Sequence, residues 1–160
     1  MEFIVRAALI GIGATALFDL WVRLLVLLRL PAANWALVGR WFAHAGRGRF
    51  AHADITAATP VRGETAIGWT MHYLVGILFA AALLAIWGLD WARAPTLGPA
   101  LAVGLVTVLA GWLILAPGMG AGIASRKRPN PNRIRLVQIA GHAVFGLGLY
   151  LAAVIVEALA

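Results

Sequence analysis

The strongest constraint on this fold is that four long stretches of the chain are almost free of charged residues. Each stretch is close to the roughly 20 apolar residues that an α-helix needs to cross about 30 Å of hydrocarbon. Of the 160 residues, 62% are hydrophobic and 12% are charged, whereas a soluble domain carries about a quarter charged residues. The sequence therefore predicts an all-α integral membrane protein, a single domain over residues 1–160 whose four transmembrane helices form a bundle. The expected spans are residues 3–28, 67–89, 98–116 and 134–158.

The basic residues gather in the first and third connections between these spans. They are Arg40, Arg47, Arg49 and Arg62 in the first, and Arg126, Lys127, Arg128, Arg133 and Arg135 in the third. These connections lie on the same side of a four-span protein, and the positive-inside rule makes that side cytoplasmic. We therefore expect a multi-pass protein with both termini outside. The net charge of +7 then reflects topology, and the expected partner is the lipid bilayer rather than nucleic acid.

Two further features of the chain ends and connections bear on this topology. The first apolar stretch continues past a small-residue pattern at 14–16, which favours an uncleaved span over a signal peptide. The cytoplasmic basic cluster Arg126, Lys127 and Arg128 follows a glycine-rich segment. It can contact lipid phosphates, but topology alone is the better explanation for it.

The first connection is long enough to hold short helices of its own. Asn34 is a suitable N-cap, and an apolar face with helical spacing follows it. That face comprises Trp35, Val38, Trp41 and Phe42. We expect a helix that lies in the membrane interface, with a second short helix at most over residues 50–56.

Small and polar residues share one face in three of the four spans when each span is examined in steps of four. The stripes are Gly11, Thr15 and Asp19; Glu64, Gly68, His72 and Gly76; and Gln138, His142 and Gly146. Residues four apart are neighbours on a helix, and membrane helices associate through small residues and interhelical hydrogen bonds. The stripes therefore predict a pocket inside the bundle that contains Asp19, Glu64, His72 and His142. The third span has no ionisable group and is expected to serve in packing.

An ionisable residue within a span indicates a functional site, because a charge at mid-bilayer costs about 3 kcal/mol on insertion scales. The leading hypothesis is an uncharacterised inner-membrane protein whose His/carboxylate pocket binds or translocates a small ligand, a metal ion or a proton. Imidazole and carboxylate donors suit a divalent metal ion, the one cofactor that the composition suggests. The candidate ligands are His44, His52, His72, His142 and Glu64. The chain has no cysteine and no HExxH motif, so this is weaker evidence than a metal-binding motif.

Other interpretations remain open at this point. Asp19 can simply pair with Arg23 one helical turn away, and His72 and His142 can be hydrogen-bonded core residues. The alternative functions are a metal-dependent membrane enzyme acting on a lipid or quinone, and a structural or partner-binding subunit without chemistry. The glycine faces would also permit a homo-oligomer. The absence of a catalytic motif favours a protein that is not an enzyme.

Six strings that together cover nearly the whole chain resemble a known family. They are GIGATALFDLW (11–21), VGRWFAHAGRGRFAH (38–52), PVRGETAIGWTMHYLVG (60–76), PTLGPAL (95–101), PGMGAGIASRKRPNP (117–131) and HAVFGLGLYLAA (142–153). They resemble a bacterial family of small multipass membrane proteins catalogued as domain of unknown function 2938. The resemblance implies a multi-helix protein of the bacterial inner (cytoplasmic) membrane, and it adds no activity.

The same resemblance implies which polar residues are characteristic of the family. These are Asp19, Arg40, His44, His52, Glu64, His72 and His142. One departure is visible, since Arg128 stands where the family pattern has a threonine before the proline. This departure weakens any functional role for the third connection.

Overall fold

A computed structural model describes all residues from 1 to 160 and contains helices but no strands. Four helical segments are long and apolar enough to cross a membrane, as predicted. They are α1 (Glu2–Leu27), α3 (Glu64–Arg93), the segment Leu97–Gly118 and α7 (Pro131–Ala158). The segment Leu97–Gly118 consists of α4 (Leu97–Val106), α5 (Val108–Ala110), the π-helical turn η2 (Gly111–Leu115) and α6 (Ala116–Gly118).

The connection between α1 and α3 holds the short helix α2 (Trp35–Ala45) and the 3-10 turn η1 (Ile55–Ala57). As predicted, Asn34 caps α2, since its side chain accepts a hydrogen bond from the backbone N–H of Leu37 at 3.2 Å. A further 3-10 turn, η3 (Ile123–Ser125), lies between α6 and α7. The predicted second helix over 50–56 is reduced to the single turn η1.

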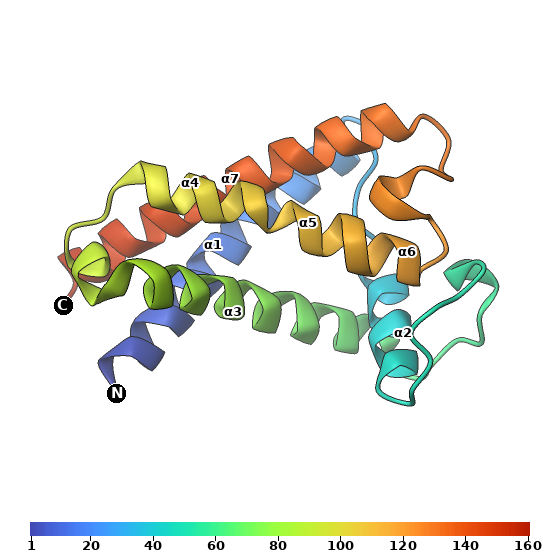
Figure 1. The fold of residues 1–160 in the computed structure, drawn as a ribbon, viewed down its shortest axis with the longest axis horizontal. Coiled ribbons are helices and arrows are strands. Elements are labelled where there is room, and N and C mark those ends of the chain that lie inside the picture. Colours follow the sequence, from blue (N-terminus) through green and yellow to red (C-terminus); the bar gives the residue numbers. More distant parts are fainter.

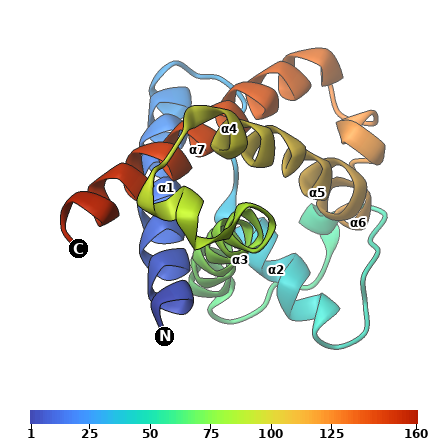
Figure 2. The same cartoon turned by 60° about the vertical axis from the view of Figure 1, so that its left-hand side comes forward.

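Each long helix packs against selected neighbours (Figures 1 and 2). Helix α1 contacts both α3 and α7, α4 lies against α7, and α2 crosses the first turns of α3. Both termini and the α3–α4 turn lie at one end of the bundle, whereas α2, α6 and η3 lie at the other. We call these the terminal end and the α2 end.

The tightly packed core lies in the half of the bundle nearer the terminal end. It includes Ile10, Leu83, Leu84 and Leu149, none of which is more than 1% exposed. Helices α4 and α7 meet there almost backbone to backbone, because a Cβ at Gly104 would lie 2.5 Å from the Cα of Gly146.

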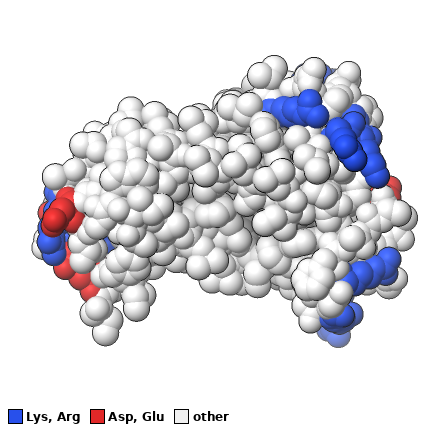
Figure 3. All heavy atoms as spheres, in the orientation of Figure 1, with Lys and Arg blue, Asp and Glu red and all other residues white.

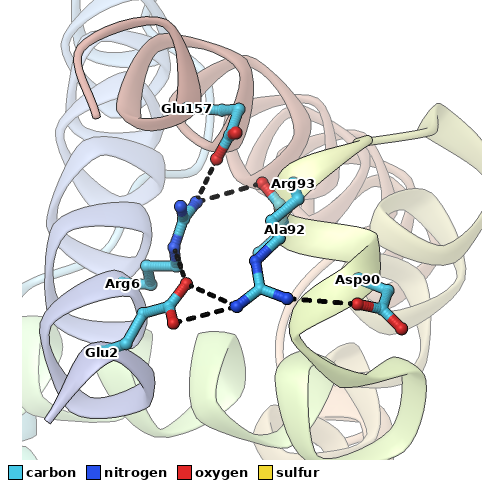
Figure 4. Close-up of polar contacts among 6 residues, drawn as sticks. All are labelled: Glu2, Arg6, Asp90, Ala92, Arg93 and Glu157. Carbon is cyan, nitrogen blue, oxygen red and sulfur yellow. Dashed lines mark hydrogen bonds and ion pairs between the residues drawn. The ribbon is translucent and has the colours of Figure 1, made fainter.

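On the face shown in Figure 3, the charged residues lie at the two ends of the bundle and none lies in the middle. The terminal end carries a network that the sequence did not reveal (Figure 4). Arg6 of α1 binds Glu2 at 3.0 Å, Glu157 of α7 at 2.6 Å and the carbonyl oxygen of Ala92 of α3 at 3.3 Å. Arg93 of α3 adds a 3.0 Å pair with Glu2. This network joins α1, α3 and α7 where the chain begins and ends.

The helix ends depart from the prediction at three places. Helix α3 continues to Arg93 through a break at Gly88, whose φ of 78° suits a residue without a Cβ. Helix α7 begins at Pro131, before the expected residue 134, because proline is favourable in the first turn of a helix. The third span widens into the π-helical turn η2 instead of continuing as a regular α-helix.

Candidate functional site

The half of the bundle nearer the α2 end contains a cavity of about 410 Å³ between α1, α2, α3, η2 and α7. Its wall is mainly apolar. Six aromatic residues contribute to the wall, namely Phe18, Trp35, Trp41, Phe42, Phe79 and Phe145. His72 and His142 both line the cavity, and the ring of Phe18 lies 5.6 Å and 6.3 Å from their respective ring centres. The structure thus brings the histidines of two long apolar helices to one cavity.

His72 of α3 is held by the carboxylate of Asp19 on α1. Its Nε2 lies 2.9 Å from Asp19 Oδ1, and the Tyr73 hydroxyl donates to Asp19 Oδ2 at 2.8 Å. A carboxylate accepts hydrogen bonds, so the proton of this contact belongs to His72 Nε2. The Trp35 ring stacks on the imidazole at 3.9 Å. Asp19 therefore orients His72 and does not form the alternative pair with Arg23.

His142 of α7 is held by the third span. The Thr107 hydroxyl donates to the carbonyl oxygen of Gly104 at 2.7 Å, so its oxygen accepts from His142 Nδ1 at 3.1 Å. The Gly104 carbonyl oxygen lies 3.2 Å from the same nitrogen. The third span, which we expected only to pack, therefore fixes which nitrogen of His142 carries the proton. In the sequence, the only indication of this contact was Thr107, which lies three residues after Gly104 on one face of the third span.

The π-helical turn η2 shapes the opposite wall of the cavity. Thr107 and Ala110 precede this turn, and Gly111, Ile114 and Leu115 within it also line the cavity. A Cβ added at Gly111 would meet no atom within 4 Å, so this glycine borders open space. Single π-helical turns within α-helices are frequently found at functional sites.

Glu64 does not line the cavity, contrary to the prediction. Its two carboxylate oxygens bind Arg40 of α2, each at 2.8 Å, and Oε2 also accepts from the Val61 N–H at 3.0 Å. These hydrogen bonds raise the pKa of Arg40 above its ordinary value. Because α2 crosses the first turn of α3, Glu64 faces α2, and the pair fastens α2 over the end of the cavity.

His44 and His52 form a second pair at the α2 end. His44 Nδ1 lies 2.8 Å from His52 Nε2, and His52 Nδ1 donates to the carbonyl oxygen of Gly118 at 3.1 Å. Both side chains are buried and are not solvated interfacial residues. The pair joins α2 to α6 and does not reach the cavity.

The five predicted metal ligands do not form one set. Glu64 binds Arg40, His44 pairs with His52, His72 binds Asp19, and His142 binds Thr107. No group of three or more histidine, cysteine or carboxylate side chains in the structure could hold a metal ion. The structure therefore does not bring these five residues together at one site, because the sequence does not specify which neighbour each side chain meets.

The predicted basic cluster Arg126, Lys127 and Arg128 is exposed at the α2 end and forms no ion pair. The two residues directly before the cluster, Ala124 and Ser125, have left-handed backbone conformations with φ values of 48° and 58°. Figure 3 shows mainly lysines and arginines at this end, whereas acidic and basic residues lie side by side at the terminal end. The cluster lies outside the cavity wall.

Comparison with known proteins bears on family rather than activity. Neither the curated proteins nor the solved structures contain a match to this chain. A family model described as a protein of unknown function (DUF2938) matches residues 8–156, which include every residue of the cavity wall. This match covers most of the chain and confirms the resemblance seen in the sequence. The chain therefore belongs to the DUF2938 family.

Proposed function

We propose that this protein is an integral membrane protein that binds a small, largely apolar ligand in the cavity between His72 and His142. The observation that carries the proposal is that both imidazoles line one mainly apolar cavity while one nitrogen of each has no protein partner. Small-molecule sites typically combine an apolar wall of about 300–1,000 Å³ with a few fixed polar groups. The cavity has this character.

The rim of the cavity supports entry from the bilayer. Leu78 of α3 and Ile114 of η2 line the cavity, yet they are 64% and 61% exposed. Both lie within segments long enough to span a membrane. The cavity thus opens sideways between α3 and η2, where a transmembrane orientation places lipid. A ligand that takes this route is soluble in the hydrocarbon of the membrane.

Filling the cavity is expected to remove the ligand without unfolding the protein. Gly111→Leu places a side chain in open space at a residue with ordinary helical backbone angles. Gly98→Leu is the matched control, because a Cβ there also meets no atom within 4 Å and Gly98 lies outside the cavity. We expect the purified wild type and Gly98→Leu to carry similar amounts of a lipophilic molecule. In Gly111→Leu the bound amount is expected to fall at least about tenfold, which corresponds to a loss of about 1.4 kcal/mol or more in binding free energy. Mass spectrometry of solvent extracts measures this, and equal content in all three proteins would overturn the proposal.

We also propose that the α2 end faces the cytoplasm of a bacterial inner membrane and that both termini lie outside. The support is the excess of lysines and arginines at that end (Figure 3), which the positive-inside rule assigns to the cytoplasm. The opposite end instead neutralises Arg6 and Arg93 with carboxylates.

Single cysteines test this orientation directly, since the chain has none of its own. Asp90→Cys at the terminal end and Arg47→Cys at the α2 end both replace exposed residues. In spheroplasts we expect a membrane-impermeant maleimide to label Asp90→Cys at once and Arg47→Cys only after permeabilisation. The reverse order of labelling would contradict the orientation.

A further inference from the structure

We infer that the ligand is a lipid-soluble aromatic diol of the quinol type, bound through its two hydroxyl groups by His72 and His142. The inference rests on the proposed function and names the chemical class of its ligand. It follows from the direction of the hydrogen bonds that hold the two imidazoles, because those bonds determine what each ring can still offer to a third partner.

Each imidazole keeps one nitrogen that is free to accept a hydrogen bond. His72 uses Nε2–H to bind Asp19, and His142 uses Nδ1–H to bind Thr107 and the Gly104 carbonyl. In a neutral imidazole one nitrogen is a donor and the other an acceptor. His72 Nδ1 and His142 Nε2 are therefore acceptors. Neither is sealed off, since the only side-chain nitrogen that is both fully buried and unpaired is that of Trp21.

Two acceptors in one cavity select a ligand with two donors. A hydroxyl group can donate to an imidazole nitrogen, whereas the carbonyl oxygen of a quinone or the oxygen of an ether cannot. A buried acceptor left without a donor costs free energy comparable to a lost hydrogen bond. The cavity therefore favours the diol over the corresponding dione and diether.

The walls of the cavity favour a flat aromatic ring between those acceptors. The Phe18 ring lies within 6.3 Å of both imidazole centres, and the Trp35 ring already stacks on His72. No arginine, lysine or unpaired carboxylate lines the cavity, which leaves no counter-charge for an ionic ligand. A volume of about 410 Å³ suits a single substituted ring, and an alkyl tail can leave between Leu78 and Ile114.

The inference is tested with three probes that share one decyl-substituted ring, namely the 1,4-benzenediol, its dimethyl ether and its oxidised quinone. Calorimetric titration into protein-loaded nanodiscs, with empty nanodiscs as the blank and a reductant present for the diol, measures specific binding. We expect the diol to saturate the wild type with at least about tenfold higher affinity than either other probe, as one hydrogen bond predicts.

Two substitutions connect that preference to the imidazoles. His142→Phe and His72→Phe each remove one acceptor and are expected to reduce the preference for the diol about tenfold. Tyr150→Phe is the control, because it removes a hydroxyl group from the same helix as His142 at a residue that lies outside the cavity. Comparison of the three probes on the unaltered protein does not depend on whether a variant folds.

The outcomes separate the inference from the proposed function. Equal binding of diol, ether and quinone, or an undiminished preference for the diol in both histidine variants, would overturn the assignment of the ligand as a diol. The proposal that the cavity binds a ligand would still stand. The same holds if no probe binds while a different molecule co-purifies and is lost in Gly111→Leu. If no probe binds and no molecule co-purifies with the protein, both the diol assignment and the proposed ligand-binding function are wrong.

Discussion

Replacing Arg40 with methionine is expected to lower the free energy of unfolding by about 3–5 kcal/mol, the usual cost of removing one partner of a buried ion pair. The Arg40 and Glu64 side chains are only 10% and 16% exposed. Methionine would leave the Glu64 carboxylate without its cation and would also withdraw the Nη1 donor from the carbonyl oxygens of Ile55, Thr56 and Ala58. Thermal or denaturant unfolding in detergent measures the loss.

Arg93→Met is the matched control for this substitution. Arg93 also pairs with a glutamate, but its side chain is 49% exposed, and exposed ion pairs contribute little to stability. We therefore expect Arg93→Met to leave the unfolding transition nearly unchanged. If the two variants proved equally stable, Arg40 would not fasten α2 to α3 as described.

Gly39→Ala is expected to destabilise the protein by about 1–3 kcal/mol, the typical cost of overpacking, even though alanine is the better helix former. A Cβ at Gly39 would overlap the carbonyl oxygen of Glu64, and a Cβ at Gly68 would overlap that of Trp35. Helix α2 must then move away from α3, which separates Trp35 from His72. Unfolding measurements and the loss of the co-purifying ligand both report this displacement.

Gly46→Ala provides the control on the same helix. It is the C-cap of α2, and an added Cβ would make only ordinary contacts of 3.5 Å and 3.8 Å. We expect this variant to be as stable as the wild type. A loss of stability in Gly46→Ala as large as that in Gly39→Ala would show that the close crossing of α2 and α3 is not the cause.

The sequence was informative where a periodic pattern determines the structure. The length of the apolar stretches alone located the four long helices. The four-residue spacing of small and polar residues placed Asp19 and His72 on the facing sides of α1 and α3. The structure accounts for this register, since Gly76 packs against Thr15 one turn from that contact. Small residues allow the two backbones to approach closely, so the polar residues of the same stripes meet.

The sequence was uninformative where the docking of one element on another decides the contact. Arg40 and Glu64 are 24 residues apart, and nothing in the spacing states that α2 folds back over α3. Thr107 was expected only to pack, because a threonine hydroxyl in a helix can bond a carbonyl oxygen of its own preceding turn and so indicates no partner on another helix. The π-helical turn after it has no local signature. The five candidate metal ligands lie apart for the same reason, since the sequence does not show which of their side chains are neighbours.

A structure of the protein purified with its native lipids measures the central claim most directly, namely that His72 and His142 hold one ligand in one cavity. We expect density for a non-protein molecule that contacts both imidazoles in the wild type and is lost in Gly111→Leu. A cavity closed by its own side chains, or a molecule that touches neither imidazole, would contradict it.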